Sequence, residues 1–279
     1  MKYDRFFSFG CSFTNWHWPT WADIIGHEFE EEKFFNLGIS GAGNEFIFHR
    51  LTEANARYNL NHNDLVIISW TNFAREDRWI RCWQTPGNIF NQTYYDSDFR
   101  KKYFDLKGAL IKTSSFIAGA THLLDSVGCD YIFISAFPMR QIDQFDNVFA
   151  DKEFDVVFNV YKNYYKKIKI SITEHAYGKN KFENPTPYSV RIKTSEIPGV
   201  MHDREFLYMC DSSHPTVLQH LSYVEKIILP EIKRELTLSE HTLNWINEYD
   251  KNIQKQGYFY DEQGYNRRPN WHKHHSNLL

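Results

Sequence analysis

Short apolar runs alternate with amphipathic segments along the first half of the chain. The apolar runs predict buried strands at residues 5–9, 33–37, 64–70 and 131–135. Between them, apolar residues recur at helical spacing and predict helices at residues 20–29, 44–60 and 107–127. Strands that alternate with helices favour a parallel sheet covered on both faces. We therefore expect a three-layer α/β/α sandwich with a mainly parallel sheet of about five strands.

The pattern is weaker in the second half of the chain. Residues 154–174 are Tyr-rich with helical spacing, whereas residues 177–205 are polar and contain prolines, which is typical of a long surface loop or flap. Residues 207–210 predict a short last strand, and a helix is expected to begin at Pro215. The expected organisation is one main domain over residues 1–237 with an insertion at about 73–205, then a C-terminal helix and polar tail over 238–279.

The composition fits a single folded domain and argues against two kinds of partner. Of 279 residues, 42% are hydrophobic, which is enough for a sizeable core. The formal net charge is -3 and the basic residues are scattered, so we expect no nucleic-acid partner and no membrane partner. No apolar run approaches the roughly 20 residues that span a bilayer, and the N-terminus lacks the pattern of a signal peptide. We therefore expect a cytoplasmic protein.

Cysteine and histidine usage predicts neither a metal site nor a disulfide framework. The four cysteines are widely spaced and form no CxxC pair: Cys11, Cys82, Cys129 and Cys210. This spacing favours free thiols in a reducing compartment. The tail contains His272, His274 and His275, and a solvated tail is favoured there over a transition-metal site. We expect no metal and no other cofactor.

Two loops that follow predicted strands carry residues that could take part in catalysis or ligand binding. Ser12 lies just past the first strand, in FSFGCSFT, where a parallel sheet presents its C-terminal edge to ligands. The stretch NLGISGAGN, residues 36–44, follows the second strand, and its glycines allow positive φ and a close approach of the backbone to an anion. It matches neither a dinucleotide fingerprint nor a P-loop. Each segment alone is most often just a turn.

Two further segments complete a possible catalytic set. Asn72, in IISWTN, lies just beyond the third strand and can aim its amide at the same edge. Asp211 and His214, in DSSHP, stand three residues apart before a helix. A carboxylate at that spacing can hold the imidazole Nδ1–H while Nε2 faces a serine. Taken alone, Asp211 or His214 is equally well explained as a helix cap.

The four segments together resemble the SGNH (GDSL-like) hydrolase family, whose serine, glycine, asparagine and DxxH blocks occur in this order. The resemblance implies a flavodoxin-like α/β fold and a serine esterase that needs no cofactor. It further implies Ser12 as nucleophile, His214 as its base and Asp211 as the residue that orients the histidine. The backbone N–H groups of Ser12 and Gly41 and the side-chain amide of Asn72 would form the oxyanion hole.

Two positions depart from the family's pattern. Cys11 stands where the family has an Asp before the serine, and Phe73 stands where it has an Asp after the asparagine. Those Asp residues make polar contacts around the loops, so we expect the loops of this chain to be held differently. Cys11 is also a rival nucleophile, although the resemblance places it one residue too early and facing the sheet.

The substrate is predicted only as a class. The chain is 17% aromatic, and Trp16, Trp18, Arg75 and Trp79 lie close in sequence to the proposed catalytic residues. They could form a wall for an O-acylated sugar or an acidic glycan, although ordinary packing is the more common explanation for the aromatic residues. Arg75, Arg78 and Arg81 have helical spacing, which also fits a solvated helix face.

Removal of an acetyl group from a carbohydrate is the leading hypothesis, with a small-molecule or glycan ester as the substrate. Two other classes stay open. An SGNH-type O-acyltransferase would use the same serine and histidine and protect the acyl-enzyme from water, with the stretch at 177–205 as a cover. A non-catalytic carbohydrate-binding protein on the same fold would explain the departures at Cys11 and Phe73 together with the aromatic surplus.

Overall fold

A computed structural model of the chain describes most of the sequence. The described residues are 2–16, 18–90, 95–140, 152–177, 189–193, 205–209 and 214–256. For residues 189–193, 205–209 and 252–256 the description covers the backbone only.

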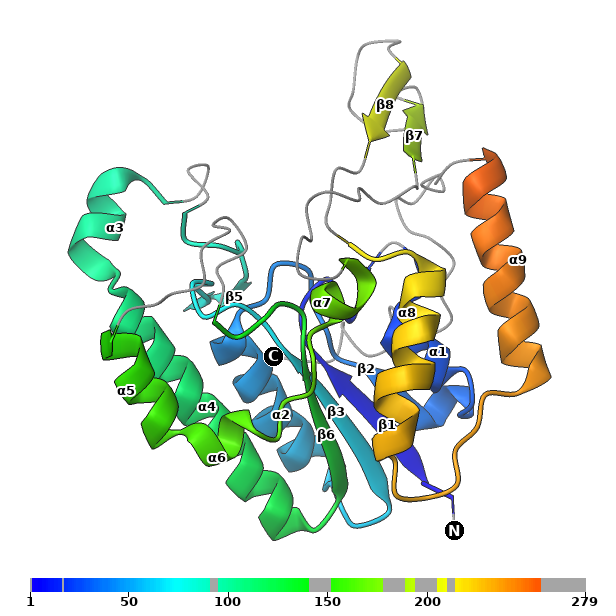
Figure 1. Ribbon diagram of the computed structural model, residues 1–279, viewed down its shortest axis with the longest axis horizontal. Coiled ribbons are helices and arrows are strands. Elements are labelled where there is room, and N and C mark those ends of the chain that lie inside the picture. Colours follow the sequence, from blue (N-terminus) through cyan, green and yellow to red (C-terminus); the bar gives the residue numbers. More distant parts are fainter. Residues whose placement is uncertain are drawn as a thin grey trace.

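The centre of the fold is a parallel sheet in the strand order β2-β1-β3-β6 (Figure 1). Its strands are β1 (Arg5–Phe9), β2 (Phe34–Asn36), β3 (Asp64–Trp70) and β6 (Asp130–Ser135). Every residue of β3 is buried, because β3 pairs with β1 on one side and β6 on the other while helices cover the sheet. The prediction of an α/β sandwich with a parallel sheet is therefore confirmed.

Helices cover both faces of this sheet, and Figure 1 shows them as two groups on opposite sides of the strands. One group contains α1 (Trp21–Gly26), α8 (Val217–Tyr223) and α9 (Glu240–Gln256), with α9 packed on α8. The other contains α2 (Asn44–Tyr58), α4 (Leu106–Val127), α5 (Lys152–Val160) and α6 (Lys162–Tyr165). After α8 the chain continues through a π-helical turn, Val224–Ile228, and a 3-10 turn, Leu229–Glu231.

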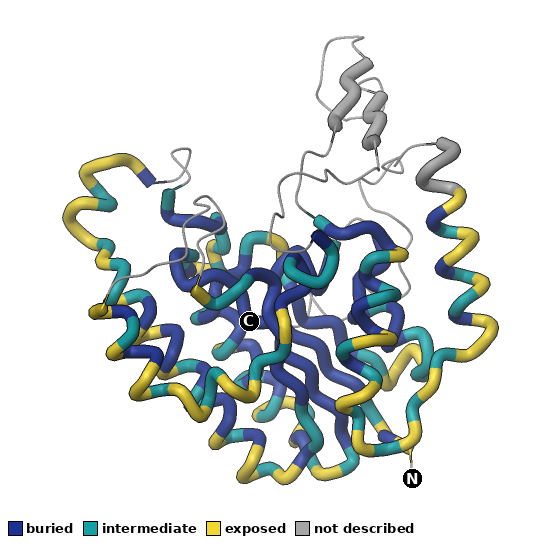
Figure 2. The backbone as a smooth tube through the Cα atoms, in the orientation of Figure 1, coloured by how far each residue is buried: buried dark blue, intermediate teal, exposed yellow. Residues whose placement is uncertain are grey.

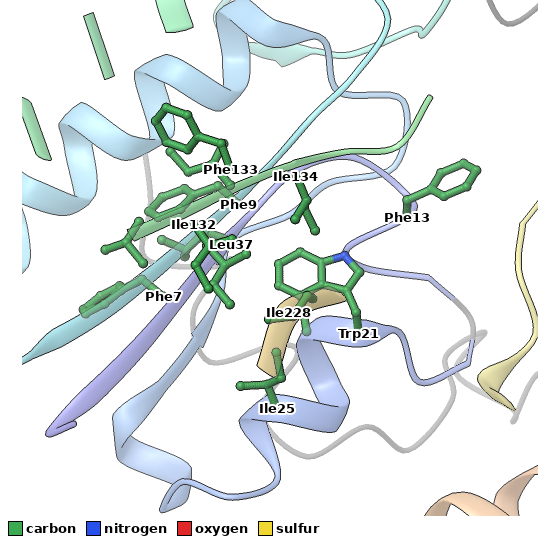
Figure 3. Close-up of a cluster of buried hydrophobic side chains, with 14 of the residues drawn as sticks. Phe7, Phe9, Phe13, Trp21, Ile25, Leu37, Ile132, Phe133, Ile134 and Ile228 are labelled. Carbon is green, nitrogen blue, oxygen red and sulfur yellow. The ribbon is translucent and has the colours of Figure 1, made fainter. Parts of the chain in front are cut away.

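Apolar side chains fill the space between the helices and the sheet. Trp21 and Ile25 of α1 and Ile228 of the π-helical turn are fully buried against one face of the strands (Figure 3). Burial of side chains of this size stabilises the fold by about 1.5–3 kcal/mol each. Figure 2 shows the strands as a continuous buried layer, with exposed residues on the outer surfaces of the helices.

The region predicted as an insertion, 73–205, is divided by two elements of the sandwich itself. Both α4 and β6 fall inside it, and β6 belongs to the central sheet. The first inserted piece therefore ends before α4. It contains an antiparallel hairpin of β4 (Arg78–Ile80) and β5 (Cys82–Gln84), followed by α3 (Ser97–Tyr103).

The Tyr-rich segment predicted as one helix at 154–174 is broken into α5, α6 and α7 (Ile172–Tyr177). The chain is extended between α6 and α7, where Ile168 forms a single parallel bridge with Phe133 of β6. The N–H of Lys169 donates to the carbonyl of Phe133 at 2.9 Å. This bridge occupies the position of a fifth strand at the edge of the sheet.

The last predicted strand, at 207–210, does not join the central sheet. It corresponds to β8 (Glu205–Met209), which pairs antiparallel with β7 (Ser189–Lys193). The prediction of a strand here is confirmed, and its pairing with β7 could not be predicted because a short apolar run does not specify the partner strand. Most of the predicted flap at 177–205 lies outside the described residues. In the part that is described, no helix is both long and apolar enough to cross a membrane.

Candidate active site

Ser12 and His214 meet at the C-terminal edge of the parallel sheet. Ser12 lies three residues past β1 and is 4% exposed, and its Oγ is 2.7 Å from Nε2 of His214. The two residues are 202 positions apart in the sequence. At this distance the serine hydroxyl can donate to an imidazole whose Nε2 is unprotonated. The structure thus brings together the two residues that were predicted as nucleophile and base.

The loop that carries Ser12 is fixed by hydrogen bonds between buried groups. The N–H of Thr14 donates to the carbonyl of Cys11 at 2.9 Å, which closes a tight turn around the serine. The carbonyl of Thr14 accepts from Oγ1 of Thr20 at 2.6 Å and from Nδ2 of Asn36 at 2.9 Å. These bonds tie the loop after β1 to β2 and to the start of α1. They show how the loop is held in the absence of the family's Asp.

Cys11 is fully buried in the main hydrophobic cluster. Ser12, its neighbour, makes the contact with His214. A fully buried thiol is not accessible to a substrate in this structure. This burial agrees with the expectation that Cys11 faces the sheet.

The imidazole of His214 rests on aromatic rings. The ring of Trp16 stacks on it, with centroids 3.8 Å apart and planes 2° from parallel, and Phe13 contacts it with centroids 4.7 Å apart. The backbone next to the histidine is also anchored, because Nε1 of Trp18 donates to the carbonyl of Pro215 at 2.8 Å. Asp211, predicted to orient Nδ1 of His214, lies outside the described residues.

The two tryptophans predicted as a ligand wall have a different place in the structure. Trp18 is fully buried, so it has no surface to offer a ligand, and its indole supports the segment behind His214. Trp16 is half-buried and one face of its ring is covered by His214. The prediction for Trp18 is therefore wrong. Trp16 and Trp18 are close to Ser12 in sequence, but in the structure both contact the distant segment at His214 and Pro215.

Gly41 has the backbone conformation that only glycine adopts readily. Its φ is +80°, and a Cβ at this position would lie 2.1 Å from the carbonyl oxygen of Thr85. The hydroxyl of Thr85 donates to the carbonyl of Ser40 at 3.1 Å, so the glycine loop packs directly on the chain that follows the β4–β5 hairpin. On its other side, Nη1 of Arg75 donates to the carbonyl of Ala42 at 3.1 Å. Arg75, predicted to bind substrate, thus holds the glycine loop.

Asn72 is buried, and its orientation is fixed by a local turn. Its Oδ1 accepts from the N–H of Ala74 at 2.7 Å, and this bond orients the side-chain amide. The preceding residue, Thr71, is clamped by Asn44, whose side chain donates to the Thr71 carbonyl and accepts from its N–H, both at 2.9 Å. No role for Asn44 was predicted, because this contact joins the start of a helix to the end of a strand.

Asp77 is a buried carboxylate that caps α2 from a distance. Its two side-chain oxygens accept from the N–H of Gly43 at 2.8 Å and from the N–H of Phe46 at 2.9 Å. Burial raises the pKa of Asp77 to about 6, although both N–H bonds favour the charged form. Sequence reasoning missed this residue, since ordinary helix caps lie next to the helix in sequence.

Phe73, the second departure from the family's pattern, packs into a separate hydrophobic cluster. It is 6.2 Å from Phe154 between ring centroids, and the cluster also contains Ala74 and Leu110. The loop after β3 is therefore held by apolar packing on one side and by Asn44 on the other.

The remaining predicted residues lie on the β4–β5 hairpin. Trp79 is 51% exposed and its ring meets that of Trp83 edge to face at 5.7 Å. Arg78 belongs to β4, and Arg81 occupies the hairpin turn with φ +62°. The helical interpretation of Arg75, Arg78 and Arg81 is therefore wrong, because a spacing of three also fits a loop that leads into a hairpin.

No group of three or more His, Cys, Asp or Glu side chains in the described ranges is placed to hold a metal ion. Cys11, Cys82 and Cys129 are free thiols. Cys210 and the tail histidines His272, His274 and His275 lie outside these ranges.

Comparisons with protein-family models and with curated proteins found no match. Among solved structures, the chain is similar to a GDSL-like lipase from Bacteroides thetaiotaomicron, at 16% identity and a TM-score of 0.40, over 81% of this chain and 85% of that one. It is also similar to a member of the lipolytic G-D-S-L family from Veillonella parvula, at 13% identity and a TM-score of 0.40, over 81% of this chain and 98% of that one. Because these TM-scores are low, the function proposed below rests on the contacts of Ser12 and His214.

Proposed function

We propose that the protein is a serine esterase, which hydrolyses an ester bond through an acyl-enzyme on Ser12. The observation that carries this proposal is the 2.7 Å contact between Ser12 Oγ and His214 Nε2 at the ligand-binding edge of the sheet. A serine hydroxyl is a weak nucleophile until a base removes its proton, and a base must lie within about 2.6–3.2 Å to do so.

In the proposed reaction, Nε2 of His214 takes the proton of Ser12 while Oγ attacks the ester carbonyl. The tetrahedral intermediate collapses, the bond to the alcohol breaks, and the alcohol oxygen receives the proton from His214. Water then attacks the acyl-enzyme, again losing a proton to His214, and the acid leaves while Ser12 regains its proton. Asp211 is proposed to orient the imidazole and stabilise its charged form.

The oxyanion is proposed to bind to three donors: the N–H groups of Ser12 and Gly41 and the amide of Asn72. Two observations support this set. The positive φ of Gly41 turns the backbone of the glycine loop, and the bond from the Ala74 N–H fixes the orientation of the Asn72 amide. Removal of one such donor typically lowers turnover about 10²- to 10³-fold.

The stacked Trp16 suits the charge that the histidine acquires during the reaction. A cation over an indole face is stabilised by about 0.5–2 kcal/mol, and imidazolium is such a cation. The parallel stack also restricts rotation of the ring, because tilting it would break the 3.8 Å contact. Trp16 therefore supports the base and lies beside the reacting atoms.

As the substrate class we propose an O-acetylated carbohydrate. The exposed ring of Trp79 and the half-buried ring of Trp83 offer stacking surfaces near the glycine loop. Aromatic faces of this kind suit the apolar face of a sugar. An acyltransferase would give a transferred acetyl group instead of free acetate when an alcohol acceptor is present, so product analysis distinguishes the two reactions.

The test is labelling of the purified protein with a fluorophosphonate probe, followed by intact mass and peptide mapping. We expect one adduct, on Ser12, which disappears in Ser12→Ala. Cys11→Ser is the matched control, because it changes the neighbouring residue and should keep the label. Labelling that survives Ser12→Ala and is lost in Cys11→Ser would contradict the assignment of the nucleophile. Folded wild-type protein without any adduct would favour a carbohydrate-binding protein on this fold.

A further inference from the structure

A pocket of about 560 Å³ lies beside the glycine loop, between the β4–β5 hairpin and the segment that leads into α3. Its lining includes Arg78, Trp83, Gln84, Thr85, Tyr95 and Phe99. This volume is within the range of about 300–1,000 Å³ that is usual for small-molecule sites. No residue of the pocket takes part in the proposed chemistry of Ser12.

The pocket shares a wall with the proposed oxyanion hole. Thr85 lines the pocket, and its carbonyl oxygen packs against Gly41 so closely that no side chain fits there. Its hydroxyl donates to Ser40 of the same loop. A substrate whose ester carbonyl binds at Gly41 would therefore have this pocket next to its remaining part.

Arg78 is the only charged residue among the described residues that line the pocket. Its guanidinium lies 4.4 Å from the ring centroid of Phe99, which fixes the position of the charge. The only ion pair it makes among the described residues is a long one, 3.5 Å to Glu76. With 39% of its side chain exposed, the guanidinium can offer N–H donors to a ligand in the pocket.

The other lining groups suit a ring that carries hydroxyl groups. Trp83 offers an indole whose position is fixed by edge contacts with Phe46 and Trp79, at 5.5 and 5.7 Å between ring centroids. Gln84 and Thr85 supply polar groups on the same wall. The hydroxyl of Tyr95, on the opposite part of the lining, donates a long hydrogen bond of 3.5 Å to the carbonyl of Glu76 and can also accept one from a sugar hydroxyl.

We infer that this pocket binds a sugar ring bearing a carboxylate, with Arg78 as the group that recognises the acid, and so selects acidic carbohydrates as substrates. The inference rests on the proposed function for its link to Ser12, whereas the binding itself does not depend on catalysis. The guanidinium fork matches a carboxylate with two parallel N–H bonds, a geometry that a neutral sugar cannot supply.

The test is a calorimetric titration of the Ser12→Ala protein with a galacturonic acid trisaccharide and with the galactose trisaccharide of the same linkage. We expect the acidic sugar to bind at least tenfold more tightly than the neutral one. Adding Arg78→Gln should weaken the acidic sugar about 10- to 100-fold, as for the loss of a charged hydrogen bond, and leave the neutral one unchanged.

Arg81→Gln in the same background is the matched control, because Arg81 lies in the same hairpin, is exposed and does not line the pocket. It should leave both affinities unchanged. Equal binding of the two sugars, or an equal loss with Arg78→Gln and Arg81→Gln, would overturn the inference. Arg78→Lys keeps the positive charge without the forked guanidinium and should recover part of the affinity for the acidic sugar. An unchanged thermal midpoint shows that the variants fold.

The fluorophosphonate experiment separates the two proposals. Labelling of Ser12 without selective binding of the acidic sugar would refute the pocket inference and leave the esterase proposal standing. Selective binding without labelling would support the pocket and count against the esterase.

Discussion

The serine side and the histidine side of the candidate active site are held by different kinds of contact. On the serine side, buried polar groups of Thr14, Thr20 and Asn36 form a hydrogen-bonded network around the loop. On the histidine side, among the described residues, the imidazole lies on the rings of Trp16 and Phe13, and the indole of Trp18 donates a hydrogen bond to the adjacent backbone.

This difference suits the two chemical roles. A nucleophile has to keep one position relative to its oxyanion donors, and a network of buried hydrogen bonds specifies one geometry. A base that collects a proton from a serine and delivers it to a leaving group needs small adjustments of its ring. Stacking allows such in-plane shifts at little cost, because the contact area changes slowly.

The largest effect is expected from removing the base itself. His214→Ala should lower turnover of an activated ester by about 10⁴-fold or more, as in other serine–histidine pairs. The serine network does not involve His214, so the far-UV circular dichroism and the thermal midpoint should stay close to those of the wild type. Turnover within tenfold of the wild type would show that Ser12 does not depend on this histidine.

A second prediction concerns the buried carboxyl group of Asp77, which accepts hydrogen bonds at the start of α2. Because its pKa is raised from 3.8 to about 6, the folded protein holds this proton more tightly than the unfolded chain. Protonation of Asp77 therefore stabilises the folded protein by about 3 kcal/mol below about pH 4. This contribution is lost as the pH rises to about 6. Asp77→Asn, which lacks this titration, should therefore become more stable relative to the wild type over that interval.

Urea unfolding of wild type and Asp77→Asn at a series of pH values from 4 to 8 measures this difference directly. Above about pH 6 the difference should be constant. A wild type that instead gains stability over the variant as the pH rises would mean that the amides of Gly43 and Phe46 outweigh burial.

The smallest expected effects are on stability, and they compare the hydrogen-bonded contacts of the serine side with the stacked rings of the histidine side. Asn36→Ala removes an acceptor of the Gly38 N–H and a donor to the Thr14 carbonyl, and should lower the free energy of unfolding by about 1–3 kcal/mol. Trp16→Phe keeps an aromatic face against His214, so its effect should be smaller. Thermal or urea unfolding of both variants provides the measurement, and a larger loss for Trp16→Phe would reverse the comparison.

Much of this arrangement could be predicted from the sequence. The apolar runs of β1 and β3 were sufficient to expect a parallel sheet, because strands that alternate with helices follow that pattern. The pairing of Ser12 with His214 was expected only because four segments together resemble the SGNH hydrolase family and follow strands that end at one edge of the sheet.

What could not be predicted depends on contacts between residues far apart in sequence. The bond from Trp18 to Pro215 joins positions 197 apart, and Asp77 caps a helix that begins more than thirty residues earlier. The spacing of Arg75, Arg78 and Arg81 fits a helix or a hairpin equally well, so only the backbone decides between them. The pocket beside Gly41 depends on that hairpin and was likewise not predictable.

The separation of Ser12 and His214 in the sequence also has a consequence for refolding. Closing a loop of this size carries a large entropic cost, so the contact is stable only when the first strand and the segment before α8 are both anchored. A partly folded chain can contain β1 and still have an unactivated serine. The return of probe labelling after dilution from denaturant would therefore report completion of the whole sandwich, whereas helix signals would recover earlier.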